Sequence, residues 1–179
     1  MRLFFILLFV TLPSLALSND WDALNEPGSF TIMRHALAPG TGDPPEFELE
    51  DCSTQRNLDE RGRDQARRLG DAIREQGIAF DIVLTSQWCR SRETAEILDV
   101  APVSEAPALN SFFGDFERRD DQTNAARNLV TNTEGKLLLV SHQVNISALT
   151  GQGTRSGEML IVRLTDEGAE VLGSVLIEP

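Results

Sequence analysis

The sequence contains two histidines, and each stands directly behind a short apolar run: His35, which is preceded by Arg34, and His142. A third apolar run is followed by a polar cluster that holds Arg90. A neutral imidazole nitrogen can attack phosphorus, and a phosphorylated histidine is reactive enough to be hydrolysed afterwards. Guanidinium groups present planar forks of N–H donors that suit the oxygens of a phosphoryl group. These residue types predict one pocket for phosphoryl transfer, and its candidate residues are Arg34, His35, Arg90 and His142.

The elements that must position these residues alternate between strand and helix patterns. Strand-length runs of apolar or alternating character cover 29–33, 81–85, 136–140, 158–164 and 170–177. Apolar residues at helical spacing predict helices, which cover 57–77, 91–98, 122–132 and 143–149. The Pro-containing segment 99–119 is predicted to be irregular. Strands that alternate with helices indicate an α/β layered domain with a mainly parallel sheet.

The first predicted helix has clear boundary signals. Asn57, with Glu60 three residues later, resembles a capping box, and Gly77 ends the run of helical spacing. Before this helix, residues 36–50 are rich in proline, glycine and acidic side chains. This composition predicts a surface loop beside the site, either a lid or a plain solvated connection.

The ends of three predicted strands decide whether the pocket exists. The runs 29–33, 81–85 and 136–140 each end where candidate pocket residues begin. Ligands of parallel sheets bind beyond the carboxyl ends of the strands. If these strands are parallel neighbours, two imidazoles and two guanidiniums meet at one edge of the sheet.

Length and composition predict a single globular domain at 19–179. The full chain has 179 residues, of which 41% are hydrophobic and 25% charged. The segment 1–18 has one basic residue near its start, an apolar stretch and small residues at its end, which predicts a secretory signal peptide. The alternative is an uncleaved membrane anchor; after cleavage no stable membrane span is expected. Export predicts a periplasmic or secreted protein.

Charge and cysteine content narrow the classes of partner. The net charge of −12 argues against nucleic acid, because nucleic-acid binding depends on basic side chains. An anionic substrate therefore needs a local positive site. The two cysteines, Cys52 and Cys89, either form a disulfide in an oxidising compartment or stay as two separate buried thiols. The sequence leaves the oligomeric state open.

Four motifs in order resemble the histidine phosphatase superfamily, which includes the cofactor-dependent phosphoglycerate mutases and the histidine acid phosphatases. The motifs are Thr-Ile-Met-Arg-His at 31–35, Gly-Arg-x-x-Ala at 62–66, Thr-Ser-x-x-x-Arg-x-x-x-Thr-Ala at 85–95 and Val-Ser-His at 140–142. The order and spacing of the four motifs carry the resemblance, which covers most of the chain after the predicted signal peptide.

The resemblance implies a three-layer α/β/α sandwich with a mainly parallel central sheet. It implies that His35 is the nucleophile and that His142 is the second histidine of the pocket. Arg34 and Arg90 correspond to the arginines that hold the phosphate. Arg56 is a further phosphate-binding candidate, with pairing to a surface carboxylate as its alternative. The resemblance implies no metal and no organic cofactor for hydrolysis.

The proton donor of this family has no direct counterpart in the sequence. Ser111 stands where the mutase-like branch has a glutamate, and Gln143 stands where the acid-phosphatase branch has an aspartate. Asp115 and Glu117 are the nearest candidates for the general acid, and the alternative is that both are solvated surface carboxylates. The next candidates belong to the predicted loop and are Asp43 and Glu48. If none of them acts, substrates with good leaving groups are favoured.

The leading prediction is a phosphatase that hydrolyses phosphomonoesters through a phosphohistidine on His35. Its predicted substrate is a phosphorylated small molecule or an envelope phosphate outside the cytoplasm. A mutase is disfavoured because the chain is short and offers little sequence to enclose a phosphorylated intermediate. The alternative from another class is a non-catalytic phosphate-binding module, which retains the pocket but has lost the general acid.

Overall fold

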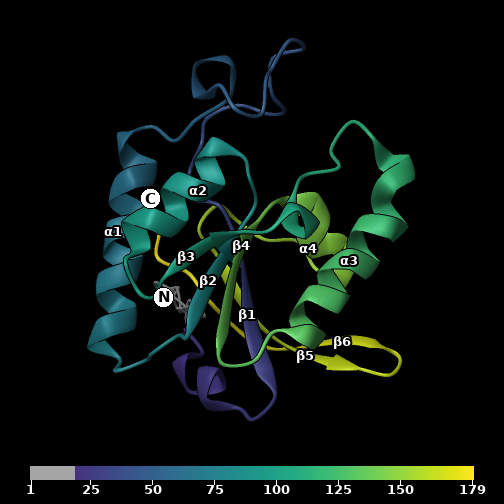
Figure 1. The fold of residues 1–179 in the computed structure, drawn as a ribbon. Helices are drawn as coiled ribbons and strands as arrows, with labels where there is room; N and C mark the ends of the chain where they lie inside the picture. The colour runs from purple at the N-terminus through teal and green to yellow at the C-terminus, as the bar shows by residue number, and fades with distance from the viewer. Residues whose placement is uncertain (1–18) are drawn as a thin grey trace, which may run out of the picture.

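The computed structural model describes residues 19–179, so the predicted signal peptide at 1–18 lies outside the described residues. One six-stranded sheet runs through the middle of the described chain, in the order β3-β2-β4-β1-β5-β6 (Figure 1). Its strands are β1 (Ser29–Arg34), β2 (Ile82–Thr85), β3 (Val103–Glu105), β4 (Leu137–Ser141), β5 (Met159–Thr165) and β6 (Gly168–Val175).

The first four strands pair in parallel, and the last two strands run antiparallel to their neighbours. Strand β4 pairs with both β1 and β2, and β2 also pairs with β3, always in parallel. Strand β5 pairs antiparallel with β1. It also pairs antiparallel with β6, because a short turn joins β5 directly to β6. The prediction of a mainly parallel sheet is confirmed, with an antiparallel hairpin at one edge.

Helices cover both faces of the sheet and produce three layers (Figure 1). Helices α1 (Glu60–Glu75) and α2 (Cys89–Leu98) pack on one face, and α3 (Arg119–Asn132) and α4 (Gln143–Thr150) pack on the other. The described chain also contains short 3₁₀ helices, which are η1 (Trp21–Asn25), η2 (Cys52–Thr54), η3 (Pro107–Leu109) and η4 (Phe116–Arg118). The α/β/α sandwich is therefore confirmed. Within 19–179, none of the helices combines the length and the apolar character that crossing a membrane requires.

Strand β4 lies inside the sheet and is buried along its whole length. Leu138 and Val140 belong to the core on the α1 and α2 side, whereas Leu137 and Leu139 belong to the core on the α3 and α4 side. Successive side chains of a strand point to opposite faces, so a continuous apolar run is typical of a strand that is covered on both faces. Both cores therefore fix β4, and with it the position of His142 beyond its end.

Helix α1 begins later than predicted and has a different cap. The carboxylate of Asp59 accepts a hydrogen bond of 2.9 Å from the backbone N–H of Gly62, so Asp59 is the N-cap. The amide of Asn57 instead donates to the backbone carbonyl of Cys52 at 2.6 Å. The predicted capping box at Asn57 is therefore wrong. Asparagine and aspartate are comparable N-caps, and the contacts of the preceding loop decide between them.

The segment 99–119 is more regular than predicted. It contains the edge strand β3, which pairs with β2, and the short helices η3 and η4. All residues of β3 are exposed, so the strand has no alternating apolar pattern in the sequence. Helix α2 also begins at Cys89, before its predicted start, and this places Arg90 in the first turn of a helix.

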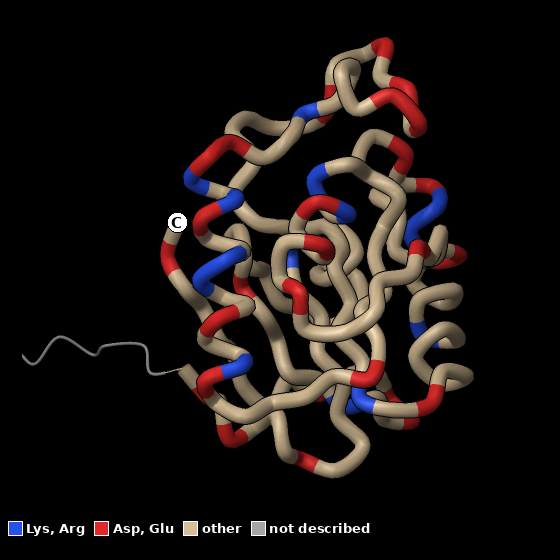
Figure 2. Tube along the Cα trace, turned by 60° about the vertical axis from the view of Figure 1, so that its left-hand side comes forward, with Lys and Arg blue, Asp and Glu red and all other residues tan. Residues whose placement is uncertain are grey.

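The loop between β1 and α1 rises above the sheet at the top of Figure 1. It is irregular apart from η2 and a bridge between Glu48 and Asp51. A disulfide joins Cys52 of this loop to Cys89 at the start of α2, which decides between the two states that the sequence leaves open. Acidic residues gather along the outer part of the loop (Figure 2).

Candidate active site

The carboxyl ends of β1, β2 and β4 meet at one edge of the sheet, because β4 lies between the other two and all three are parallel. His35 follows β1 and His142 follows β4, and their ring centroids are 5.5 Å apart. Arg90 reaches both imidazoles from the first turn of α2. The structure thus brings together the residues that the three strand ends were expected to gather.

The imidazole of His35 is buried and held in one tautomer. Its Nδ1 lies 2.7 Å from the backbone carbonyl of Ala36, which can only accept, so Nδ1 carries the hydrogen. Its Nε2 therefore has a free lone pair and accepts from Nε–H of Arg90 at 3.1 Å. Burial first, and then the charge of Arg90, hold the pKa of His35 well below its ordinary value. The residue is a neutral imidazole at neutral pH, which is the form that a nucleophile needs.

Ala36 follows His35 directly and helps to join the end of β1 to helix α2. Among the described residues other than glycine, only Asp99 has a positive φ, so Ala36 is unstrained. Its backbone N–H donates to the hydroxyl of Thr94 at 3.0 Å, and that hydroxyl donates to the carbonyl of Arg90 at 2.7 Å. Thr94 therefore connects the end of β1 to helix α2.

All five N–H groups of Arg90 have protein partners. The inner edge faces the imidazoles, with 3.1 Å from Nε to His35 and 3.4 Å from Nη2 to Nδ1 of His142. The outer edge binds both carboxylate oxygens of Asp43, at 2.7 and 3.1 Å. Nη1 also donates to the backbone carbonyl of Arg56 at 3.3 Å. Asp43 thus holds the outer edge, while the inner edge carries the two longer contacts with the imidazoles.

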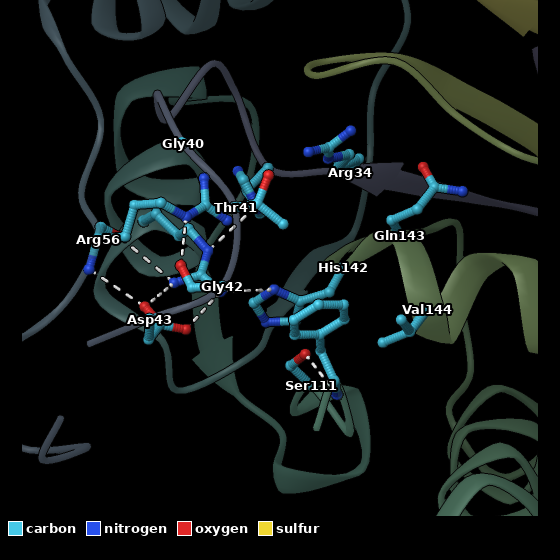
Figure 3. A pocket seen from close by; sticks show the side chains of 13 residues that line it. Arg34, Gly40, Thr41, Gly42, Asp43, Arg56, Ser111, His142, Gln143 and Val144 are labelled. Atoms are coloured by element: carbon cyan, nitrogen blue, oxygen red, sulfur yellow. Dashed lines mark hydrogen bonds and ion pairs between the residues drawn. The ribbon is translucent and has the colours of Figure 1, made fainter. Parts of the chain in front are cut away.

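Asp43 comes from the loop between β1 and α1 and binds donors from separate segments (Figure 3). Besides Arg90, it accepts from the backbone N–H of Arg56 at 3.1 Å and from the indole N–H of Trp88 at 3.0 Å. Burial raises the pKa of Asp43, but the hydrogen bonds and charge of Arg90 outweigh burial, so the pKa lies below its ordinary value. Asp43 is thus an ionised carboxylate at neutral pH, and it orients Arg90 rather than supplying protons.

Arg34 and Arg56 add positive charge to the same site. Nε of Arg34 is buried without a hydrogen-bond partner, and its Nη1 makes only a long contact of 3.5 Å with the carbonyl of Thr154. Nε of Arg56 donates to the carbonyl of Gly42 at 2.7 Å. Burial and then the charge of Arg90 lower the pKa of Arg56 to about 10, so it is still protonated at neutral pH. Arg34 therefore has N–H donors that are free for an anion. Arg56 instead donates to the backbone of the loop between β1 and α1.

His142 stands immediately before helix α4. Its Nε2 lies 2.8 Å from the hydroxyl oxygen of Ser86, and its Nδ1 faces Arg90. Its ring packs edge-on against Trp88, with the centroids 5.4 Å apart. Burial and then the charge of Arg90 hold the pKa of His142 well below its ordinary value. Both imidazoles of the site are therefore neutral at neutral pH.

A cavity of about 190 Å³ opens onto these groups (Figure 3). Its charged or proton-bearing lining consists of Arg34, His35, Arg56, Arg90, His142 and Asp43. The rest of the lining includes Thr41, Ser111, Gln143, Val144 and Phe113. Neutral imidazole, guanidinium forks and a small half-open volume together suit the transfer of one phosphoryl group.

The structure does not place the nearest predicted proton donors in the cavity. Asp115 and Glu117 are exposed and lie outside the lining, which makes them solvated surface carboxylates in this structure. Ser111 and Gln143 do line the cavity, but neither side chain is a carboxylic acid. The carboxylate that the lining does contain is Asp43, which is ionised. No group of three or more His, Cys, Asp or Glu side chains within 19–179 is arranged to hold a metal ion.

Two residues of the site have roles that the sequence analysis missed. Asp43 was expected at most as a reserve proton donor, and Ser86 was not singled out. Asp43 lies in a loop without periodicity, so only its contacts identify it. Ser86 lies four residues before Arg90 in the third motif, at the end of β2, and that position was the available signal.

Comparison with known proteins shows which family this chain resembles in sequence. The model of the histidine phosphatase superfamily (branch 1) matches residues 31–129. The match ends before His142, which the fold brings into the same pocket. A curated relative, the mitochondrial serine/threonine-protein phosphatase Pgam5 of Drosophila grimshawi, is 35% identical over 69 residues, which cover 35% of this chain and 24% of that protein. The matched segment thus spans about a quarter of that relative.

Solved structures share the fold at low sequence identity. The protein histidine phosphatase SixA complexed with tungstate is 20% identical, with a TM-score of 0.56, and the match covers 83% of this chain and 96% of that one. Rv3214 of Mycobacterium tuberculosis is 16% identical, with a TM-score of 0.63, and the match covers 84% and 97% of the two chains. The architecture described above therefore extends over nearly the full length of both structures.

Proposed function

This chain belongs to the histidine phosphatase superfamily, and we propose that this phosphatase hydrolyses phosphomonoesters outside the cytoplasm through a phosphohistidine on His35. The contact that carries the proposal joins Nε2 of neutral His35 to Nε–H of Arg90 at 3.1 Å. The nucleophilic lone pair and an anion-binding donor therefore meet at one point, which a phosphoryl group enters by displacing this hydrogen bond. A phosphoryl group at that point has its phosphorus beside the imidazole and its oxygens beside the guanidinium.

In the first step, Nε2 of His35 forms a P–N bond while the bond from phosphorus to the leaving oxygen breaks. Nδ1–H keeps its hydrogen bond of 2.7 Å to the carbonyl of Ala36, which stabilises the positive charge that the ring gains. Arg34 and Arg90 offer N–H donors to the equatorial oxygens of the transferring group. The leaving group departs as an anion or takes its proton from solvent.

In the second step, a water molecule attacks the phosphohistidine. A P–O bond to water forms, the P–N bond breaks, and inorganic phosphate leaves with the proton balance supplied by solvent. His35 returns to the neutral tautomer that its contact with Ala36 favours. The net reaction is hydrolysis of one phosphate ester, and no other co-reactant is needed.

The cavity lining favours substrates with good leaving groups. Its carboxylate, Asp43, is ionised, and Ser111 and Gln143 offer no carboxylic acid. Loss of general-acid catalysis typically costs about 10²–10⁴ in rate for a poor leaving group. Aryl phosphates, whose phenolate leaves without prior protonation, should therefore react faster than alkyl phosphates.

The extracytoplasmic location of the reaction is supported by two features of the chain. Segment 1–18 has the pattern of a secretory signal peptide. The disulfide between Cys52 and Cys89 belongs to a class of bond that persists in oxidising compartments. On this proposal the substrate is a small-molecule or envelope phosphate, and fractionation of cells that express the full chain tests the location.

Phosphate release from p-nitrophenyl phosphate tests the reaction. The full chain is expressed with its own leader and purified, alongside His35→Ala and the volume-matched His35→Gln. We expect release by the wild type and none above background by either variant. Incubation with ³²P-labelled substrate, stopped by denaturation at alkaline pH, should leave label on the wild type alone, and later treatment with acid should release that label. Equal release by the wild type and both variants would contradict the proposal.

A non-catalytic phosphate-binding module is the second candidate. It is favoured by the lack of a protonated carboxylic acid among the described lining residues. Such a module would bind inorganic phosphate saturably and would acquire no label on His35. Label on His35 together with turnover would identify an enzyme and reject the phosphate-binding module.

A further inference from the structure

The side chain of Asn110 has one orientation that satisfies its neighbours. Its Oδ1 lies 2.9 Å from the backbone nitrogen of Gln87, and an N–H group can only donate. Its Nδ2 donates to the side-chain oxygen of Gln87 at 2.9 Å. Oδ1 is therefore fixed as an acceptor, and it lies 3.3 Å from the hydroxyl oxygen of Ser86.

Ser86 transmits this orientation to His142. The hydroxyl of Ser86 donates to Oδ1 of Asn110, and the backbone N–H of Trp88 donates to the Ser86 hydroxyl oxygen at 3.2 Å. That oxygen is left as an acceptor toward Nε2 of His142, at 2.8 Å. Nε2 of His142 therefore carries the hydrogen and donates it to Ser86.

The other ring nitrogen gives the same assignment independently. Nδ1 of His142 lies 3.4 Å from Nη2 of Arg90, which has only N–H groups to offer, so Nδ1 presents a lone pair. His35 has the opposite tautomer, because its Nδ1–H donates to the carbonyl of Ala36. The two imidazoles thus carry their hydrogens on different nitrogens, and both lone pairs point at Arg90.

A bound oxyanion favours protonation of the His142 imidazole. The charged and titratable groups that face its ring are Arg34, His35, Arg56 and Arg90. Burial and the three cations among these groups keep the free imidazole neutral. When an anion displaces the inner-edge contact of Arg90, an anionic oxygen faces the lone pair on Nδ1. Two acceptors then oppose each other with no hydrogen between them, which is unfavourable in a buried site.

We propose that Ser86 and Asn110 hold His142 in the tautomer with its hydrogen on Nε2, so that a tetrahedral oxyanion binds together with one proton on Nδ1. The proton comes from solvent, or from a substrate that enters as its monoanion. The imidazolium then donates from Nδ1 to a phosphoryl oxygen and from Nε2 to Ser86. The inference rests on the proposed function for the identity of the natural anion. Ser86 and Asn110 are positioning residues, because they act through His142.

Proton-coupled binding has a direct thermodynamic signature. A tungstate ion is a dianion near neutral pH, so any proton taken up on binding goes to the protein. Calorimetric titration of the full-length protein in two buffers of different ionisation enthalpy measures that uptake. The wild type should take up about one proton per tungstate bound, and its affinity should fall up to about tenfold for each unit of rising pH.

The variant Ser86→Ala separates positioning from mere packing. Without the hydroxyl, His142 can adopt the tautomer with hydrogen on Nδ1, which donates to the anion without any proton from solvent. We expect proton uptake to fall well below half of the wild-type value. The matched control is Ser91→Ala, because the hydroxyl of Ser91 lies 3.5 Å from the same Nε2, at the limit of a hydrogen bond. Ser91→Ala should keep the wild-type uptake.

Nitrogen-15 NMR of histidine-labelled protein reads the tautomers without any ligand. The chain has only two histidines, so His35→Ala assigns the two rings. The free wild type should show His35 with hydrogen on Nδ1 and His142 with hydrogen on Nε2, and Ser86→Ala should shift His142 toward the Nδ1 form. The inference is overturned if both wild-type rings have the same tautomer, if tungstate binds without proton uptake, or if Ser86→Ala retains full uptake.

These measurements require no turnover, so they can fail separately from the proposed function. Proton uptake and opposite tautomers without label on His35 would support the coupling and reject the phosphatase mechanism. Label on His35 with no proton uptake would support the mechanism and reject the coupling.

Discussion

Asp43 binds Arg90 through both carboxylate oxygens, at 2.7 and 3.1 Å, although 47 positions separate the two residues in the chain. The side chains are only 11% and 3% exposed. Bidentate pairing fixes the plane of the guanidinium, and this plane determines that the opposite edge faces both imidazoles. The loop between β1 and α1 therefore contributes to catalytic geometry and is more than a solvated connection.

Replacement of this carboxylate should separate anion binding from catalysis. In Asp43→Asn, one negative charge disappears beside the cavity, so we expect tungstate to bind more tightly. Arg90 is less firmly oriented, so kcat for p-nitrophenyl phosphate should fall. Loss of one partner of a buried pair should also lower the free energy of unfolding by about 3 kcal/mol. The control Glu48→Gln removes an exposed charge of the same loop, and an equal effect of both variants would reject a specific role for Asp43.

Stability should decrease as the pH falls below the ordinary pKa of histidine. Burial lowers the pKa of both His35 and His142 in the folded protein, whereas unfolded histidine titrates near about 6.5. Below that pH the unfolded state binds protons that the folded state does not, so folding is penalised. The two groups give a slope of up to about 2.7 kcal/mol per pH unit. Urea unfolding between about pH 7.5 and 5.5 measures it, and His142→Asn should roughly halve the slope.

Reduction of the disulfide should weaken both the fold and the site. Cys52 and Cys89 are 37 positions apart, and closure of a loop of that length stabilises the folded state by about 4 kcal/mol in the chain-entropy account. Cys89 immediately precedes Arg90, so a freed loop should also raise KM for aryl phosphate. Urea unfolding of the wild type with and without a dithiol reductant measures the first effect. The double variant Cys52→Ser, Cys89→Ser is the control, because reductant should not change its stability.

The strand ends were predictable from the sequence, and the loop contacts were not. The runs before Arg34 and Ser141 are mostly apolar because helices cover both faces of their strands, so their ends are visible in the sequence. Asp43 sits among several acidic residues of an irregular segment, and the one that folds onto Arg90 is selected by Arg56 and Trp88. Spacing alone carries no signal for such contacts.

Because spacing does not reveal loop contacts, it also could not show which carboxylates lie in the cavity. Asp115 and Glu117 were favoured because they follow Ser111 closely in the sequence, yet the chain turns them outward into solvent. We expect Asp115→Asn and Glu117→Gln to leave kcat and its pH dependence unchanged for both aryl and alkyl phosphates. A selective loss of activity toward alkyl phosphates in either variant would restore that residue as the general acid, because poor leaving groups depend most on it.

Gly62 of helix α1 lies against the segment that follows the nucleophile. A Cβ atom at Gly62 would lie 2.0 Å from the carbonyl oxygen of Leu37, and Leu37 is two residues beyond His35. Because this neighbour is backbone, Gly62→Ala must displace either the helix or the chain behind β1. We expect the free energy of unfolding to fall by about 1–3 kcal/mol. Phosphatase activity should fall as well, because the carbonyl that orients His35 belongs to the intervening residue.

The matched control is Arg61→Ala, on the exposed side of the same helix. It changes helix propensity in the same favourable direction without adding an atom against Leu37. Urea unfolding and aryl phosphate hydrolysis, measured on both variants, separate close packing from helix propensity. If Gly62→Ala is as stable and as active as Arg61→Ala, α1 does not constrain the position of the nucleophile.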